Sequence, residues 1–211
     1  MKLYLSSYRI GSEPQRLQEL VGPGRRAAII FNACDCFEQR LKFYEREEID
    51  LADLGFEAQE LDLRDYFGHP ERLRLQLMTY DLLWVVGGNT FVLARAMNAA
   101  GFAAAAGDLV RNDQLTYAGY SAGVCVTGPD LDGIHLMDYP ETVPEGYDES
   151  LPTTTLGWVP WRMVPHWRSD HPEAEAAEVA ARYMENASLA YRTLRDGHAI
   201  VIAEPGPTTS R

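Results

Sequence analysis

The sequence predicts an α/β fold, a three-layer sandwich in which helices cover both faces of a mainly parallel sheet. Short β-rich apolar runs alternate with helical stretches along the whole chain, which is the pattern of a parallel sheet with helices on both sides. Runs such as AAIIF and LLWVV are apolar without alternation, as expected for strands covered on both faces. At 211 residues the chain is expected to form one domain, residues 1–211, with a sizeable core.

The elements follow from these runs in chain order. Strands are expected at 3–6, 27–33, 58–63, 82–86, 116–118, 134–137, 162–164 and 199–202. Helices are expected around 12–20, 37–54, 70–78, 90–99, 102–111 and 172–186. Residues 139–157 are rich in Pro, Gly and acidic residues and predict a long surface loop. The tail at 205–211 is expected to be frayed.

Composition excludes several classes of function. A net charge of −12 argues against binding to nucleic acid or to an anionic membrane, because phosphates require clustered Lys and Arg. The start of the chain does not resemble a secretory signal, and no stretch reaches the ~18 apolar residues that span a bilayer. We therefore expect a cytoplasmic protein with reduced thiols. Cys34 and Cys36 lack the usual spacing of zinc ligands, so no metal or other cofactor is expected.

The loop after the expected strand 82–86 is the first candidate for a ligand site. In an open parallel sheet, ligands bind beyond the carboxyl ends of the strands. Gly87 and Gly88 let backbone N–H groups approach a ligand closely, while Asn89 or Thr90 can cap the following helix. A simple βα turn explains the same glycines.

The next strand leads into GYSAG, residues 119–123, which matches G-x-S-x-G. In this motif, small neighbours permit a sharp turn that projects the serine oxygen, and the amide that follows becomes an oxyanion donor. Ser121 is therefore the candidate nucleophile. Two successive glycine loops at strand ends could place two amide donors around one carbonyl oxygen.

A serine nucleophile requires a base, and the chain has five histidines. His166 follows the strand-like RMV and a proline, which places it at a strand end. We favour His166 over His198, which lies in the turn Asp196-Gly197-His198.

Taken together, these features resemble the S51 serine peptidases, a family that includes peptidase E (aspartyl dipeptidase) and, more distantly, cyanophycinase. The resemblance rests on GGNTF at 87–91, GYSAG at 119–123 and VPH at 164–166, and it covers nearly the whole chain. It implies a flavodoxin-like or class I glutamine-amidotransferase-like fold. It also implies acyl transfer without a metal.

Residue by residue, the resemblance makes Ser121 the nucleophile, His166 the base, and the amides of Gly88 and Ala122 the oxyanion hole. The acid is less clearly matched. Our choice is Asp138, and Asp196 is the reserve because the family has an acidic residue before the matching glycine near the end of the chain, while Asp130 and Asp132 also stay open.

The resemblance also implies a small peptide substrate, a dipeptide with N-terminal aspartate. Gly87, Asn89 and Thr90 are expected to line its site, and Arg168 is the nearest cation in sequence for the aspartate carboxylate. A homodimer is left open.

Two other functions compete with this one. An α/β-hydrolase-type esterase would share Ser121 but would use His198 as its base, although the chain lacks an HGGG-type motif. A non-catalytic peptide-binding or small-molecule-binding module would leave the serine without a chemical role.

Overall fold

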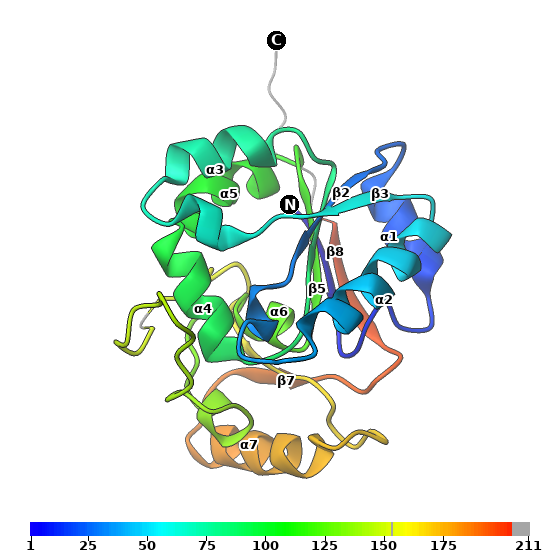
Figure 1. Cartoon of the computed structure of the whole chain (residues 1–211). Coiled ribbons are helices and arrows are strands. Elements are labelled where there is room, and N and C mark those ends of the chain that lie inside the picture. Colours follow the sequence, from blue (N-terminus) through cyan, green and yellow to red (C-terminus); the bar gives the residue numbers. More distant parts are fainter. Residues whose placement is uncertain (153, 204–211) are drawn as a thin grey trace.

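The computed structural model describes residues 1–152 and 154–203, so the expected frayed tail at 205–211 lies outside the described residues. Its centre is a six-stranded sheet in the order β3-β2-β4-β5-β1-β8 (Figure 1). All neighbouring pairs are parallel except β1 and β8, which are antiparallel. The strands are β1 (Lys2–Ser6), β2 (Arg26–Ile30), β3 (Glu57–Glu60), β4 (Leu82–Val85), β5 (Thr116–Tyr120) and β8 (Ala199–Ala203).

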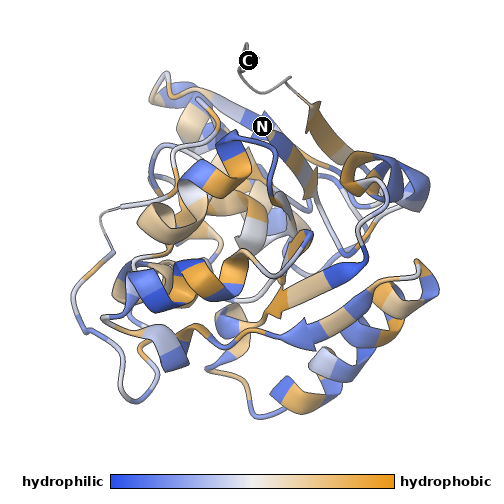
Figure 2. Ribbon diagram, turned by 90° about the horizontal axis from the view of Figure 1, so that it is seen from above, coloured by the Kyte–Doolittle hydropathy of each residue, from blue (hydrophilic) through white to orange (hydrophobic). Residues whose placement is uncertain are grey.

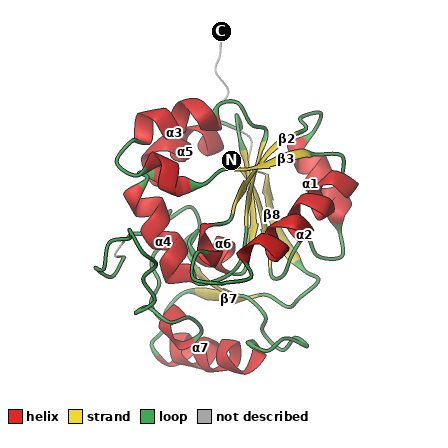
Figure 3. Cartoon of the chain, in the orientation of Figure 1, coloured by secondary structure: helices red, strands yellow, loops and turns green. Residues whose placement is uncertain are grey.

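Helices cover both faces of this sheet, which confirms the predicted α/β sandwich (Figure 3). On one side lie α1 (Pro14–Val21) and α2 (Arg40–Asp53). On the other lie α3 (Pro70–Leu77), α4 (Thr90–Ala99), α5 (Phe102–Arg111) and α6 (Ala122–Cys125). Within the described ranges, no helix is long and apolar enough to cross a membrane.

The sheet separates two hydrophobic clusters because alternate side chains of each strand point to opposite faces. Tyr4 and Trp84 pack on the α1/α2 side, whereas Leu3, Leu83 and Tyr117 pack on the other side. These five side chains are fully buried. The helices carry both hydrophobic and hydrophilic residues (Figure 2), as expected for elements with one face on the core.

A smaller layer lies beyond the carboxyl ends of the main strands. β6 (Arg162–Val164) pairs in parallel with β7 (Tyr191–Thr193), and α7 (Ala174–Asn186) packs against both. The sequence patterns did not indicate β7, which is short and has no buried residue. Short 3₁₀ helices occur at η1 (Asn32–Cys34), η2 (Leu63–Tyr66) and η3 (Ile134–Leu136).

The strand expected at 134–137 is wrong, because these residues form η3 and its flank instead. Gly133 precedes them in the left-handed conformation with φ 85°, which turns the chain out of an extended path. The strand expected at 27–33 ends at Ile30, and η1 follows it. Apart from position 153, residues 139–157 contain no helix or strand, in agreement with the expected loop.

Three neighbouring strands position the site. β4, β5 and β1 are adjacent in the sheet, with Val85 beside Gly119 and Ser6 beside Tyr120. The carboxyl end of β1 leads into Ser7, that of β4 into the Gly87-Gly88 loop and that of β5 into Ser121. These three segments are far apart in the sequence but meet at the carboxyl ends of neighbouring inner strands.

Candidate active site

Ser121 occupies a strained turn between β5 and α6. Its backbone has φ 50° and ψ −116°, a region that residues other than glycine rarely adopt. The neighbouring glycines are required by close contacts, since a Cβ on Gly119 or Gly123 would lie 2.8 or 2.3 Å from the Val85 carbonyl oxygen. The GYSAG sequence therefore lets a sharp turn pack directly against the end of β4.

The Gly87-Gly88 loop lies beside this serine. A Cβ on Gly87 would approach the Ser121 Cβ to 2.8 Å, and one on Gly88 would lie 2.5 Å from the Ala33 carbonyl oxygen. Gly88 also has φ +142°, which favours glycine. Among the described residues, no hydrogen-bond acceptor is paired with the backbone N–H of Gly88 or Ala122. Both amides are thus free to donate to a ligand.

His166 lies in the same pocket and is held by Asp196. The His166 Nδ1 atom is 2.9 Å from Asp196 Oδ1, so a neutral ring that donates from Nδ1 leaves Nε2 as an acceptor. The ring is only 1% exposed. Burial and the neighbouring His171 lower the His166 pKa, and the hydrogen bond to Asp196 opposes that shift. No direct hydrogen bond joins Ser121 Oγ to His166 in the described part of the chain, and catalytic hydrogen bonds are often long before substrate binds.

Ser7 is hydrogen-bonded to Ser121, His166 and Asp196, and it was not identified from the sequence. Its hydroxyl donates to Asp196 Oδ1 at 2.7 Å and accepts from the His166 backbone N–H at 2.8 Å. Its carbonyl accepts from the Ser121 N–H at 3.1 Å. Ser7 is fully buried. Its position directly after β1 is the only sequence signal that could have found it.

The expected pairing of Asp138 with His166 is wrong in this geometry. Asp138 Oδ2 instead accepts from the Thr90 backbone N–H at 3.0 Å, at the first residue of α4. Burial raises the Asp138 pKa, and its bonds to Thr90 oppose that shift. Two further aspartates considered from the sequence are engaged elsewhere, since Asp130 pairs with Arg162 and Asp132 accepts from Tyr183.

Several expected substrate-binding residues have other partners. Asn89 caps α4 by accepting from the N–H groups of Phe91 and Val92, and neither it nor Thr90 lines the pocket. Arg168 lines a different hollow, where it pairs with Glu178 and lies over the Trp167 ring. Sequence proximity to His166 was misleading because the chain turns sharply, with φ 61° at His166 and 51° at Arg168.

The pocket around Ser121 has a volume of about 220 Å³, below the ~300–1,000 Å³ of typical pockets for drug-sized ligands. Its lining combines segments that are far apart in the sequence, from Tyr8 to Glu173. The residues that line it are Tyr8, Cys34, Phe37, Phe43, Arg46, Val86, Gly87, Gly88, Tyr120, Ser121, His166, His171 and Glu173.

Arg46 is the arginine that lines this pocket, a role that the sequence had suggested for Arg168. Its Nη2 donates to the fully buried Glu47 at 2.9 Å. Glu47 also accepts from Tyr120 Oη at 2.8 Å and Trp84 Nε1 at 2.9 Å, so its carboxylate is well satisfied. The Nε atom of Arg46 is buried and has no hydrogen-bond partner within the described part of the chain. The Arg46 side chain as a whole is 35% exposed, so part of it faces the pocket that it lines.

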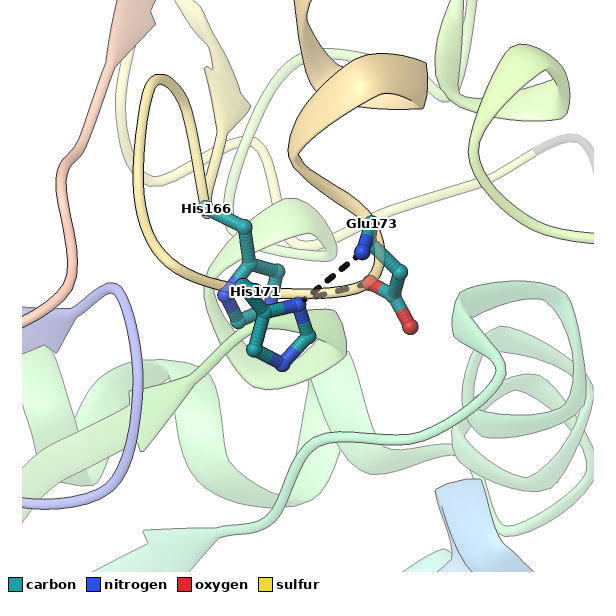
Figure 4. Close-up of side chains that lie close together, drawn as sticks. All are labelled: His166, His171 and Glu173. Atoms are coloured by element: carbon teal, nitrogen blue, oxygen red, sulfur yellow. Dashed lines mark hydrogen bonds and ion pairs between the residues drawn. The ribbon is translucent and has the colours of Figure 1, made fainter.

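His171 and Glu173 complete the wall next to His166 (Figure 4). The two imidazoles stack with centroids 3.7 Å apart and planes 7° from parallel. Glu173 Oε2 lies 3.7 Å from His166 Nε2. Burial first, then the charges of Asp138 and Asp196, raises the Glu173 pKa to about 7. Among the described residues, the side chains of His166, His171 and Glu173 form a group that could hold a metal ion. Their spacing in the sequence is not a familiar metal-binding pattern, so sequence reasoning did not indicate this group.

Comparison with known proteins identifies the family, since residues 13–208 match peptidase family S51. The chain belongs to peptidase family S51. This confirms the resemblance carried by the GGNTF, GYSAG and VPH segments.

A curated relative agrees with that assignment. An uncharacterized peptidase of Pasteurella multocida (strain Pm70) is 30% identical over 103 residues, which cover 49% of this chain and 47% of that protein. The S51 chain therefore matches about half the length of this curated relative.

Two crystal structures show the same fold as this S51 chain. A candidate peptidase E from Listeria monocytogenes EGD-e matches with a TM-score of 0.75 and 24% identity, covering 95% of this chain and 93% of that one. A peptidase from an acI-B1 Actinobacterium matches with a TM-score of 0.66 and 17% identity, covering 95% and 82%.

His198, the base that an esterase would use, lies elsewhere in this S51 chain. Its side chain is exposed, and it is not among the residues around Ser121. Its backbone carbonyl accepts from the Ser7 N–H at 3.1 Å. His166, by contrast, lines the same pocket as Ser121 and has the carboxylate of Asp196 at its Nδ1.

Proposed function

We propose that this S51 chain is a serine peptidase that cleaves short peptides through an acyl-enzyme on Ser121. The observation that carries the proposal is one pocket that contains a serine in a strained turn and a histidine held by a carboxylate. Nucleophile, base and orienting acid are the groups that acyl transfer requires.

The chemistry follows from the positions of these groups. Ser121 Oγ attacks the peptide carbonyl carbon while its proton passes to His166 Nε2, and the amides of Gly88 and Ala122 stabilise the oxyanion. Breaking of the C–N bond releases the amine, which takes the proton from Nε2. Water then attacks the ester, with Nε2 as base again, and returns Ser121 to its hydroxyl form. Asp196 holds the ring with Nε2 directed away from it.

The substrate is a short peptide, and dipeptides with N-terminal aspartate are the class we propose. The small pocket contains a cation, Arg46, and a carboxylate, Glu173. An N-terminal aspartyl residue carries both complementary charges: its side-chain carboxylate suits a guanidinium, and its α-ammonium suits a carboxylate. Arg46 replaces Arg168 as the residue we assign to the substrate's carboxylate.

The test is hydrolysis of Asp-Leu, Glu-Leu, Leu-Leu and a short-chain nitrophenyl ester by the wild type and Ser121→Ala. We expect cleavage of Asp-Leu that is lost in Ser121→Ala and retained in Ser150→Ala, which alters an exposed serine. His166→Ala should abolish the activity and His198→Ala should not. Ester cleavage alone, lost only in His198→Ala, would instead support an esterase. No cleavage of any substrate, with no labelling of Ser121 by a fluorophosphonate probe, would favour a binding module.

A further inference from the structure

His166, His171 and Glu173 form a cluster whose potential ligand atoms all lie within 4.8 Å of one another. All three come from the segment between β6 and α7, and they lie together on the pocket wall (Figure 4). Two imidazoles and one carboxylate are a donor set typical of zinc and similar ions. Mg²⁺ and Ca²⁺ prefer sites with more oxygen ligands.

His166 is already arranged as a metal ligand. Its Nδ1 is bound to Asp196 at 2.9 Å, which leaves the Nε2 lone pair free. Histidines that bind metals usually donate their other ring N–H to a carboxylate in this way, which fixes the tautomer and the ring orientation. The 1% exposure of His166 holds the ring further in place.

Glu173 lies at a suitable distance from that lone pair. Ligand atoms about 2.1 Å from one zinc ion at tetrahedral angles are about 3.4 Å apart. Glu173 Oε2 and His166 Nε2 are 3.7 Å apart, so a shift of a few tenths of an ångström would allow both to bind one ion. The side chain of Glu173 is 44% exposed, so it can move that far.

His171 supplies the third ligand after a rotation. Its ring is parallel to that of His166, and its Nδ1 accepts from the Glu173 backbone N–H at 3.2 Å. In-plane lone pairs of parallel rings do not converge on one ion, so His171 must turn out of the stack. Its side chain is less buried than that of His166. A fourth position stays open to water, as in sites with three protein ligands.

We propose that His166, His171 and Glu173 bind a divalent ion of the zinc class, which reversibly inhibits the peptidase. The ion takes the Nε2 lone pair that would accept the Ser121 proton, and it takes the carboxylate assigned to the substrate's ammonium group. The inhibition rests on the proposed function, whereas the binding does not. The two parts therefore need separate tests.

The binding test uses Co²⁺ absorption and Zn²⁺ calorimetry on the untagged full chain treated with EDTA and then freed of the chelator. We expect one ion per chain and the visible spectrum of four-coordinate cobalt. Glu173→Gln and His171→Ala should each weaken binding at least tenfold, with circular dichroism and melting curves to verify folding. The matched control is His69→Ala, an exposed histidine at the start of α3, which should bind as the wild type does.

Two results would overturn the site. One is an absence of binding or an affinity that is unchanged in both variants, and the other is a thiolate-to-cobalt charge-transfer band, which would show that a cysteine binds the ion. Inhibition is then measured on the dipeptide that the wild type cleaves best, with Zn²⁺ added and with EDTA used to reverse it. Tight binding without inhibition of an active enzyme would refute the regulatory part alone. Absence of any hydrolysis would refute the proposed function and leave the metal site standing on its binding data.

Discussion

Asp196 Oδ1 lies 2.9 Å from His166 Nδ1, and this contact joins residues that are 30 positions apart. β7 pairs with β6, which brings the segment after each strand to the same place. His166 follows β6 and Asp196 follows β7. A small parallel sheet of two three-residue strands therefore places the acid next to the histidine.

The first prediction concerns this acid. Asp196→Asn should reduce kcat by about 10²–10⁴-fold with a smaller change in KM, because the ring loses the partner that fixes its tautomer. Asp138→Asn is the control, since Asp138 contacts Thr90, and it should keep kcat within about tenfold of the wild type. Steady-state kinetics of both variants decide between the two carboxylates. A larger loss in Asp138→Asn would show that this assignment is wrong.

The acidic side of the pH profile should report His166. Activity requires the neutral ring, so kcat/KM should fall as pH decreases through the His166 pKa. Burial and the charge of His171 lower that pKa below its usual 6.5, so the midpoint should lie below 6.5. His171→Ala removes the charge of His171 and part of the burial of His166, so it should move the midpoint upward. The profiles are measured in EDTA, with Glu173→Gln included because the pKa of Glu173 is about 7. A midpoint that moves downward in His171→Ala would contradict the assignment.

Ser7 should act as a positioning residue. Ser7→Ala removes the hydroxyl that contacts both Asp196 and the His166 backbone, and we expect kcat to fall about tenfold with a loss of stability of about 1–3 kcal/mol. Ser6→Ala is the matched control, because Ser6 is equally buried but its hydroxyl contacts are long, at 3.5 Å. If the two residues act only through packing, both variants will lose stability to a similar degree and neither will shift the pH profile.

The fold and the serine could be predicted because their signals are local. Apolar runs such as LLWVV identify strands covered on both faces, and GYSAG contains in five residues both the turn and the proposed nucleophile. The peptidase family is recognisable from three such segments. No long-range contact has to be known for any of these inferences.

The acid that pairs with His166 and the arginine that lines the pocket could not be selected in this way. Asp138 follows a segment that looks extended in sequence, whereas the short strand before Asp196 had no sequence signal, and the pairing of β6 with β7 is what brings Asp196 to His166. Arg168 is two residues from His166, yet left-handed turns at both residues direct it into another hollow. Arg46 reaches the pocket from α2, through a buried network with Glu47 that has no counterpart in any sequence motif.

Gly88 should be required for both stability and activity. Gly88→Ala places a Cβ 2.5 Å from the Ala33 carbonyl oxygen at a residue with φ +142°. We expect a loss of about 1–3 kcal/mol in the free energy of unfolding and a decrease in kcat of at least ~10²-fold, because the amide would move from its position. Gly22→Ala is the control, with φ +80° but no atom of the described residues within 4 Å of the added Cβ. It should lose some stability and keep kcat. An active Gly88→Ala enzyme would remove this amide from the oxyanion hole.

Arg46 should determine preference for acidic substrates. Arg46→Met should raise KM for Asp-Leu about 10–100-fold, since a charge-assisted hydrogen bond contributes about 1.5–3 kcal/mol. KM for Leu-Leu should change little, because that peptide has no side-chain carboxylate. Glu47 keeps its bonds from Trp84 and Tyr120, and a melting curve shows whether these suffice for folding. Arg168→Met is the matched control, because Arg168 pairs with Glu178 outside the pocket, and its KM values should equal those of the wild type. If Arg168→Met is the variant that loses selectivity for Asp-Leu, the substrate carboxylate binds where the sequence first suggested and Arg46 serves only to hold Glu47 and Tyr120.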